Sequence, residues 1–355
     1  MTTRIVLAYS GGAASARALS WLVRSANAEV VALIADLGQG GDLAEVRTRA
    51  LAGGAVRAHV LDARDEFARD FVLPTLKAQA LWDGRYPMVA AIARPLLARK
   101  LVEVARIESA TTVAHACAPR DEARLRHTVV SLDRTLTVIA CASADELPAP
   151  GFGRPTPDSR LPTPDPIPDR VDRNLWGRIV GSPGLADAWH EVPEAVYADT
   201  RPAARWPAQP AVVEIGFARG VPVSVNGITM PLAELFENLS FMAAEHGVGR
   251  LDRVKPRPDG SRTRVIVEAP AAVVLHAAHA DLQRLVSSDS TASFTRVTSA
   301  AYTGLVDAGE WFSPLRRALD AFTDTIQEEV TGRVRVRLFQ GHCDVLARAV
   351  EPLNP

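Results

Sequence analysis

Short apolar runs alternate with amphipathic stretches through the first 140 residues of the chain. Continuous apolar runs of this length indicate buried strands, and apolar residues at helical spacing indicate helices. The predicted strands lie at residues 4–9, 30–35, 56–61, 112–116 and 135–140. The predicted helices lie at residues 13–26, 43–51, 65–80 and 92–108, with Asp42 as an N-cap. Such alternation predicts a parallel sheet that is covered on both faces and binds ligands at the carboxyl ends of its strands.

The pattern changes after residue 211, where strands occur in pairs between longer helices. Two β-rich runs, 212–217 and 221–225, flank Ala218-Arg219-Gly220, which is typical of a hairpin. Further strands are predicted at 263–268, 334–338 and 345–347, and helices at 231–246, 271–286 and 313–330. Hairpins beside helices favour an α+β domain, so the whole chain is assigned to the α/β class.

A proline-rich segment separates these two patterns. Residues 147–168 contain eight prolines, which lack the amide donor and have a fixed φ, so neither a helix nor a central strand fits them. We therefore expect a nucleotide-binding domain at 1–146, an extended linker at 147–168 and a substrate and oligomerisation domain at 169–355.

Composition excludes several classes of protein. With 47% hydrophobic and 23% charged residues the chain is typical of globular proteins, and its net charge of −1 gives no general attraction to nucleic acid. Its three cysteines show neither CxxC spacing nor paired histidines, so we expect no disulfide framework and no zinc site. We therefore expect the protein to be located in the reducing cytoplasm. No apolar run reaches 18 residues, so we expect no membrane span and no membrane partner.

The first strand-to-helix turn is the main candidate for chemistry. Ser10-Gly11-Gly12 brings backbone amides and a helix N-terminus to one place, where glycines allow close approach of a phosphate oxygen. The alternative is that the glycines only permit a tight turn, and the turn alone does not decide between the two interpretations.

Several motifs in a fixed order extend the argument beyond this turn. They are Ala8-Tyr9-Ser10-Gly11-Gly12-Ala13-Ala14-Ser15-Ala16, Ala35-Asp36-Leu37-Gly38-Gln39, Tyr86-Pro87, Ala93-Arg94-Pro95, Ala114-His115, Asn174-Leu175-Trp176-Gly177-Arg178, Gly247-Val248-Gly249-Arg250-Leu251-Asp252 and Trp311-Phe312-Ser313-Pro314-Leu315. Together they resemble the argininosuccinate synthase family, whose phosphate loop has the pattern AYSGGLDTS. The resemblance covers residues 4 to about 345.

The resemblance implies an adenine nucleotide α-hydrolase-like domain followed by a synthetase and multimerisation domain. It also implies an ATP-dependent, AMP-forming ligase that uses Mg²⁺ and amino-acid-like substrates. In the family, the ureido oxygen of citrulline attacks the α-phosphate of ATP, pyrophosphate leaves, and the amine of aspartate displaces AMP. The implied nucleotide-binding residues are Ala8, Tyr9, Ser10, Gly11, Gly12, Ser15, Ala35, His115 and Ala116. The implied substrate-binding residues are Tyr86, Arg94, Arg126 and Lys255, and no residue is assigned as a catalytic group or a metal ligand.

The chain departs from the family pattern in the phosphate loop and at the aspartate-binding stretch. Residues 13–16 read Ala-Ala-Ser-Ala where the family has Leu-Asp-Thr-Ser, so an acid is missing. In the family pattern HGxTGKGNDQVR, only His115 and Arg126 match cleanly, whereas Ala118, Glu122 and Ala123 replace Thr, Asn and Asp. The glycine-rich anion loop has thus become a segment with Pro119 and two acids.

The citrulline positions are also altered. Arg170 and Ile179 stand where the family has serines, Ala90 replaces a threonine, and Val267 replaces a tyrosine. Lys255 stands where the family has a substrate-binding glutamate. A cation in place of that acid opposes the ammonium group of citrulline in the family pose.

Each retained residue also has a structural interpretation. Tyr86 can simply pack beside Pro87, Arg94 and Arg126 can be ion-pair partners, His115 can be a core histidine, and Trp176 and Trp311 are expected to pack. Two functions follow from the whole pattern. The favoured one is a ligase with substrates other than citrulline plus aspartate, because the substitutions concentrate at ligand positions. The alternative is a catalytically silent nucleotide-binding or scaffolding homologue.

The end of the sequence bears on the expected assembly. Family members continue into a helical extension that reaches a neighbouring subunit, whereas this sequence ends at Glu351-Pro352-Leu353-Asn354-Pro355, where two prolines oppose a helix. A twofold interface needs only one self-complementary patch. We therefore expect a homodimer, with a tetramer as the second choice.

Overall fold

The computed structural model describes residues 3–25, 28–141, 170–181, 183–185, 187–256 and 262–350. The predicted linker lies outside these residues, and the predicted domain division remains a prediction. The chain forms two compact units. Unit 1 comprises the described residues within 1–64, 91–160 and 305–316. Unit 2 comprises those within 65–90, 161–304 and 317–355.

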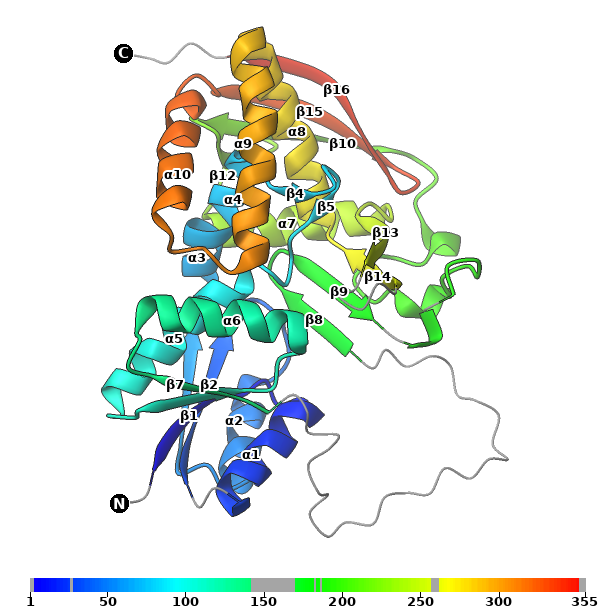
Figure 1. Ribbon diagram of the computed structural model, residues 1–355. Helices are drawn as coiled ribbons and strands as arrows, with labels where there is room; N and C mark the ends of the chain where they lie inside the picture. Colours follow the sequence, from blue (N-terminus) through cyan, green and yellow to red (C-terminus); the bar gives the residue numbers. More distant parts are fainter. Residues whose placement is uncertain are drawn as a thin grey trace. The chain divides into compact units, whose positions relative to one another are not determined.

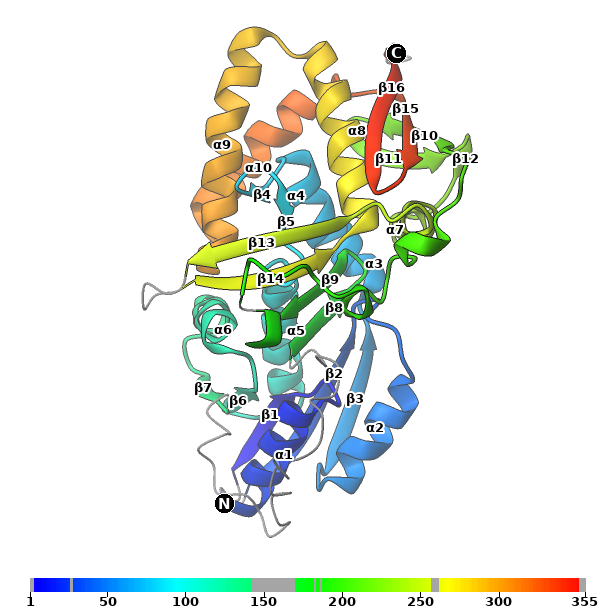
Figure 2. The same ribbon diagram turned by 90° about the vertical axis from the view of Figure 1, so that its right-hand side faces the viewer.

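Unit 1 contains a parallel sheet of five strands in the order β3-β2-β1-β6-β7 (Figures 1 and 2). Its strands are β1 (Arg4–Ala8), β2 (Glu29–Asp36), β3 (Arg57–Asp62), β6 (Thr112–His115) and β7 (Thr137–Ala140). The parallel sheet predicted from the apolar runs is confirmed, and β1 lies at its centre because it pairs with both β2 and β6.

Helices cover both faces of this sheet. They are α1 (Ala13–Ser25) and α2 (Leu43–Ala52) on one face, and α5 (Ala93–Ile107) and α6 (Pro119–Leu132) on the other. Leu7 faces the α1 and α2 layer, whereas its neighbour Val6 faces the α5 and α6 layer, and both are fully buried. The Asp42 carboxylate accepts hydrogen bonds from the amides of Ala44 and Glu45, which confirms the predicted N-cap.

Two segments of the first half differ from the sequence prediction. Residues 119–132 form helix α6, although the resemblance indicated a substrate loop there. Pro119 at the first turn is compatible with a helix because its missing amide hydrogen has no partner at that position. The helix predicted at 65–80 is instead α3 (Arg64–Phe67), a π-helical segment (Ala68–Val72) and α4 (Leu73–Lys77), because a wider turn interrupts the α-helical hydrogen bonds.

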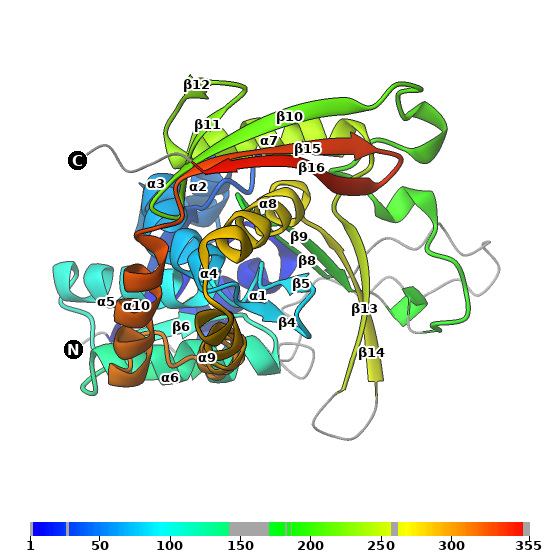
Figure 3. The same cartoon turned by 90° about the horizontal axis from the view of Figure 1, so that it is seen from above.

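Unit 2 contains a five-stranded antiparallel sheet in the order β12-β11-β10-β15-β16. Its strands are β10 (Ala211–Ala218), β11 (Val221–Val225), β12 (Ile228–Thr229), β15 (Gly332–Phe339) and β16 (His342–Val350). The predicted hairpin between β10 and β11 is confirmed. Helices α7 (Leu232–Glu245) and α8 (Pro270–Val286) lie along one face of this sheet (Figure 3).

The edge strand β16 is interrupted by a bulge. Arg335 lies opposite Ala347, but the next residue, Val336, lies opposite Val345, so Leu346 is an extra residue in β16. The extra residue changes which peptide groups of β16 face outward on either side of it.

A second antiparallel sheet of unit 2 has the order β13-β14-β9-β8 (Figure 2). Its strands are β8 (Arg170–Asn174), β9 (Gly177–Gly181), β13 (Arg250–Pro256) and β14 (Arg262–Glu268). Two short strands, β4 (Leu81–Trp82) and β5 (Tyr86–Pro87), form a hairpin in the same unit. The remaining helices are α9 (Asp289–Ala308) and α10 (Pro314–Gln327); the last residues of α9 and the first residues of α10 belong to unit 1. Short 3₁₀ turns lie at Pro183–Leu185, Glu194–Val196 and Ala203–Arg205.

No helix among the described residues is long and apolar enough to cross a membrane. Within the described residues, Cys117, Cys141 and Cys343 form no disulfide.

Candidate active site

The turn after β1 is held together by its own side chains. The Ser15 hydroxyl donates to the carbonyl oxygen of Gly12 at 2.9 Å, and its oxygen lies 3.3 Å from the Ser10 hydroxyl. The Gly12 amide lies 3.4 Å from the Ser10 hydroxyl oxygen, a long hydrogen bond. Tyr9, directly before the turn, is buried in the core between the sheet and the α1 and α2 layer, so the start of the turn is anchored by packing.

Gly11 occupies a position that favours glycine. Its φ is +77°, and a Cβ atom there would lie 3.0 Å from both the Arg49 guanidinium and a Val46 methyl group. Helix α1 begins directly after Gly12, so the free amides of its first turn point toward the same place. A left-handed glycine followed by a helix N-terminus is a geometry that can bind phosphate.

The strand order brings the predicted nucleotide-binding residues to one edge of the sheet. From β1 the chain runs outward to β2 and β3, and it later returns on the other side of β1 as β6. Ala35 lies near the end of β2, whereas His115 and Ala116 lie at and just after the end of β6. The carboxyl ends of β1 and β6 therefore form the switch point at which open parallel sheets bind ligands.

His115 is fully buried at this edge. Its Nδ1 accepts a hydrogen bond from the Cys117 amide at 3.2 Å, and its Nε2 has no partner among the described residues. Burial lowers the pKa of His115 to about 4, and the positive charges of Arg126 and Arg94 contribute to the shift. The imidazole is therefore neutral at pH 7. The structure thus brings the predicted site residues His115, Arg94 and Arg126 close enough together for the two arginines to affect the pKa of the histidine.

Both arginines of this group also have structural partners. Arg94 lies 3.4 Å from the Asp121 carboxylate, which also pairs with Arg124 at 2.7 Å. Arg126 donates to the Val138 carbonyl oxygen at 3.2 Å and lies 3.3 Å from the carboxylate of Glu122. Ion pairing thus accounts for part of their placement. For Arg126, one partner comes from a residue at which this chain departs from the family pattern.

The remaining predicted substrate residues lie in unit 2. On the β13-β14-β9-β8 sheet, Leu251 is opposite Val267, and Val267 is opposite Ile179. Lys255 is four residues beyond Leu251 on β13, so it lies on the same face. We call this surface, defined by Lys255, Val267 and Ile179, the Lys255 face. Val267 is buried, whereas Ile179 and Lys255 are half-buried.

Tyr86 lies against the Lys255 face through the β4–β5 hairpin. Its hydroxyl donates to the Asp252 carbonyl oxygen at 3.1 Å. The Arg253 guanidinium lies 4.4 Å from the Trp82 ring and 5.5 Å from the Tyr86 ring. Because Arg253 is two residues from Lys255, it shares that face. Arg253 was missed by sequence analysis because no strand was predicted at residues 250–256, although Leu251, Arg253 and Lys255 alternate there.

Two family models match the chain. One, described as the Arginosuccinate synthase N-terminal HUP domain, covers residues 4–147, and the other, described as the Arginosuccinate synthase C-terminal domain, covers 170–352. Proteins named argininosuccinate synthase from Bacillus thuringiensis (strain Al Hakam), Bacillus cereus (strain 03BB102) and Bacillus anthracis are each 40% identical over 352 residues, which is 98% of this chain and 88% of each relative. The chain belongs to the argininosuccinate synthase family.

Membership of the argininosuccinate synthase family confirms the resemblance and the α/β fold that it implied. Within that fold, Trp176 packs as expected, with its ring centroid 5.1 Å from that of Phe236. Trp311 is likewise buried and stacks with the Arg316 guanidinium at 4.2 Å. Among the described residues, no group of three or more His, Cys, Asp or Glu side chains is arranged to hold a metal ion.

Proposed function

We propose that this protein is an ATP-dependent, AMP-forming C–N ligase whose substrates differ from citrulline plus aspartate. The observation that carries the proposal is the coincidence of the Ser10–Gly12 turn with the switch point between β1 and β6. A helix N-terminus at that position stabilises phosphate through backbone amides, and these do not depend on the altered side chains.

In this proposal the triphosphate lies at Ser10, Gly11, Gly12 and Ser15, with the adenosine near Ala8 and Ala35. The neutral His115 offers Nε2 as a hydrogen-bonding atom beside the nucleotide. Mg²⁺ fits this turn only as part of a Mg·ATP complex, because the turn offers hydroxyls but no carboxylate and Mg²⁺ is commonly held by substrate phosphates. When bound, the metal would offset phosphate charge.

The proposed reaction follows that of the family. An oxygen of the first substrate attacks the α-phosphate, pyrophosphate leaves, and an amine of the second substrate displaces AMP. Orientation of the reactants supplies much of the rate in such reactions. In unit 2, Tyr86 and Lys255 would orient a substrate on the Lys255 face. In unit 1, Arg94, and Arg126 of the aspartate-binding stretch, would attract anionic substrate groups.

The altered substrate preference rests on the side chains of both units. Ala118 and Ala123 cannot supply the hydrogen bonds of Thr and Asp, and each unpaired buried polar group costs about 1–3 kcal/mol. Val267 and Ile179 make part of the Lys255 face apolar, and Lys255 adds a cation to it. Several such losses together reduce turnover of citrulline and aspartate by orders of magnitude.

The direct test is a panel of amino-acid and ureido compounds assayed for release of AMP and pyrophosphate with Mg·ATP. We expect release with at least one pair of substrates and negligible release with citrulline plus aspartate. Robust citrulline-dependent AMP release would refute the altered preference. The Lys255→Glu variant should shift the preference toward substrates with an ammonium group, and Arg205→Gln, an exposed change on a 3₁₀ turn, serves as its control.

The second candidate function is a silent nucleotide-binding or scaffolding protein. It is favoured by Ala14, which stands where the family loop has an acid. Calorimetry with Mg·ATP together with the pyrophosphate assay separates the possibilities, because a silent homologue binds nucleotide without releasing pyrophosphate from any substrate pair. If the missing carboxylate limits the chemistry, Ala14→Asp should raise turnover while leaving the fold unchanged. Absence of heat at millimolar Mg·ATP would count against the ligase and against a nucleotide-binding role, and would leave scaffolding.

We also propose a homodimer in the cytoplasm, with a tetramer as the second choice. Cysteines that form no disulfide are compatible with a reducing compartment. Light scattering at micromolar concentration tests the assembly against the chain mass of 38.1 kDa. A mass near four chains would refute the dimer, and a mass near one chain would refute both assemblies.

A further inference from the structure

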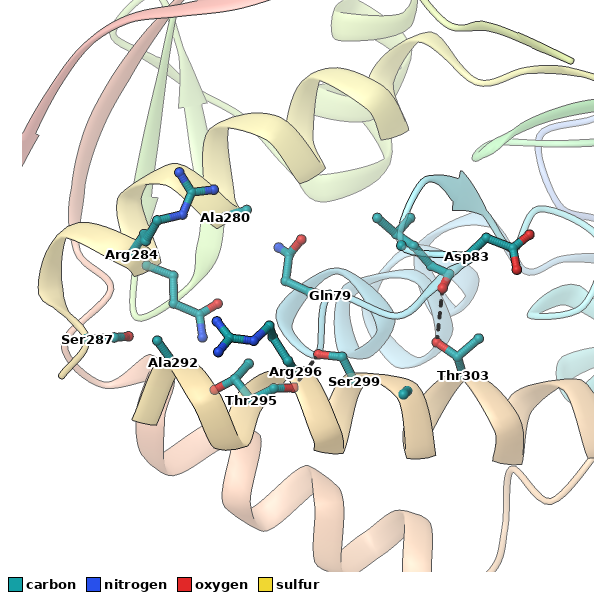
Figure 4. Close-up of a pocket in the computed structure, with 14 residues that line it drawn as sticks. Gln79, Asp83, Ala280, Arg284, Ser287, Ala292, Thr295, Arg296, Ser299 and Thr303 are labelled. Atoms are coloured by element: carbon teal, nitrogen blue, oxygen red, sulfur yellow. Dashed lines mark hydrogen bonds between the residues drawn. The ribbon is translucent and has the colours of Figure 1, made fainter. Parts of the chain in front are cut away.

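Unit 2 contains a cavity of about 630 Å³ between α8, α9 and the segment around Gln79 and Asp83 (Figure 4). Its volume lies within the range of small-molecule sites. None of its lining residues belongs to the Ser10–Gly12 turn, and the Lys255 face contributes none of its three defining residues. The cavity is therefore a separate candidate site.

One wall of the cavity is a row of hydroxyl groups on α9. Thr295, Ser299 and Thr303 follow one another at intervals of four residues, which is about 6 Å along a helix. Each hydroxyl donates its hydrogen to a backbone carbonyl oxygen: Thr295 to Thr291, Ser299 to Ala78 or Thr295, and Thr303 to Leu81. Their oxygen lone pairs are therefore left to accept hydrogen bonds from a ligand.

The opposite wall contributes a buried amide. Gln283 on α8 is only 5% exposed, and its Oε1 has no hydrogen-bond partner among the residues that the structure describes. A buried amide oxygen without a partner costs about 1–3 kcal/mol, so a ligand N–H group or a bridging water would stabilise it. By contrast, the side-chain amide of Gln79, which also lines the cavity, already has hydrogen-bond partners. Its Nε2 lies 2.6 Å from His279 Nδ1, and its Oε1 lies 3.3 Å from His276 Nδ1.

Arginine side chains add positive charge at this cavity. Arg284 is paired with Asp281 at 2.8 Å. The exposed Arg296 makes one hydrogen bond, to the Ser293 hydroxyl at 3.1 Å, and within the described ranges no carboxylate lies within ion-pairing distance of it. Figure 4 shows the Arg296 guanidinium extending from α9 toward α8. It is suited to a carboxylate, which it can bind through two parallel hydrogen bonds.

We propose that this cavity binds a free amino acid. The carboxylate pairs with Arg296, the amino group donates to the hydroxyl oxygens of α9, and Gln283 accepts from the amino group or a polar side chain. The alanines in the lining, at 280, 292 and 300, provide apolar contact. The binding is non-covalent and lies outside the residues assigned to the ligase reaction, so it provides a place for an amino acid to act as an effector.

The test is methyl NMR of the full chain labelled on alanine methyl groups, with the signals of Ala292 and Ala300 assigned by Ala→Ser variants. An equimolar mixture of the standard amino acids should shift both signals in a saturable manner. The corresponding mixture of decarboxylated amines should shift them at least tenfold less. Arg296→Gln should lose the response, whereas Arg317→Gln, an equally exposed change on α10, should retain it.

Lack of a shift at millimolar amino acid would overturn the proposal. So would an equal response to the amines, or an unchanged response in Arg296→Gln. Gln283→Leu provides a second check, because it removes the buried amide without creating a smaller side chain. This readout is independent of ATP and of turnover, so failure here is distinguishable from failure of the proposed ligase function.

Discussion

The candidate site of unit 1 depends mainly on backbone groups, whereas that of unit 2 depends on side chains. In unit 1 the proposed phosphate site, the Ser10–Gly12 turn, depends mainly on backbone groups, a left-handed glycine and a helix N-terminus, and the serine hydroxyls bond within the turn. In unit 2 the Lys255 face is made of side chains placed by strand register. A backbone site tolerates many side-chain replacements, whereas a side-chain site changes its preference with each one. On this contrast, the proposed nucleotide site is retained while the proposed substrate residues differ from the family pattern.

The largest effect is expected at Glu268, where unit 2 buries a charge. This fully buried carboxylate accepts from the amides of Ala198, Asp199 and Thr200 and pairs with Arg178 at 2.5 Å. Glu268→Gln should lower the free energy of unfolding by about 3–5 kcal/mol, because it leaves Arg178 uncompensated. Chemical denaturation measures the change.

The matched control for that variant is in unit 1. Glu108 is also buried, but its partner Arg57 is 62% exposed and can be solvated instead. We expect Glu108→Gln to cost clearly less than Glu268→Gln. Equal losses would contradict the view that unit 2 depends more strongly on buried side-chain charge.

Mild acid should affect unit 2 more than unit 1. Burial lowers the pKa of His276 to about 3 and that of His279 to about 4, and both lie in unit 2, whereas in unit 1 burial lowers the pKa of His115 to about 4. The unfolded chain binds these protons near pH 6.5 and the folded chain does not. Stability is therefore lost as pH falls from about 6.5 toward 4, by up to about 1.4 kcal/mol per pH unit for each histidine.

Denaturation followed separately in each unit, through buried Trp176 for unit 2 and buried Trp311 for unit 1, checks this order. His279→Gln should flatten the pH dependence of unit 2, and the exposed His190→Gln should not. A stability that is constant between pH 7 and pH 5 would be inconsistent with neutral buried histidines.

A smaller effect is expected in the phosphate turn. Gly11→Ala should cost about 1–3 kcal/mol, because an alanine at φ +77° is strained, and it should weaken Mg·ATP binding at least tenfold. Gly12→Ala is the control, since its added Cβ would lie at an ordinary 3.5 Å from the Ser10 hydroxyl. Calorimetry and thermal unfolding measure both effects, and equal losses in the two variants would remove the special role of Gly11.

The smallest expected effect concerns Tyr86. Tyr86→Phe removes the hydrogen bond to the Asp252 carbonyl oxygen and should cost about 1 kcal/mol of stability. If Tyr86 also contacts a substrate, the KM for the first substrate will rise while the unfolding transition shifts only slightly. An unchanged KM would leave Tyr86 with the structural role alone.

The sequence predicts the elements whose patterns are local. The β1 strand, the Ser10–Gly12 turn and the N-cap at Asp42 follow from apolar runs, glycines and capping chemistry, and all three are found. Helix α9 was missed because Ser and Thr residues interrupt its apolar spacing, although its hydroxyls bond back to the preceding turn. Helix α6 was missed because Pro119 and the family loop pattern suggested an irregular segment.

The candidate site was predictable in part for the same reason. The predicted nucleotide-binding residues lie at or just after the ends of strands, so their shared edge could be expected from the parallel sheet alone. The Lys255 face could not, because its residues meet through antiparallel register between strands far apart in sequence. The environment of His115 also depends on Arg94 and Arg126 approaching from α5 and α6, and sequence spacing does not show this approach.

The bulge at Leu346 has a consequence for solubility. A regular edge strand of nine residues would be a template on which another chain could add a strand and begin aggregation. With Leu346 inserted, the outward peptide groups before and after it are out of phase, so an incoming straight strand can match only half of β16. Removing that one residue should therefore make concentrated solutions of the protein more prone to form fibres.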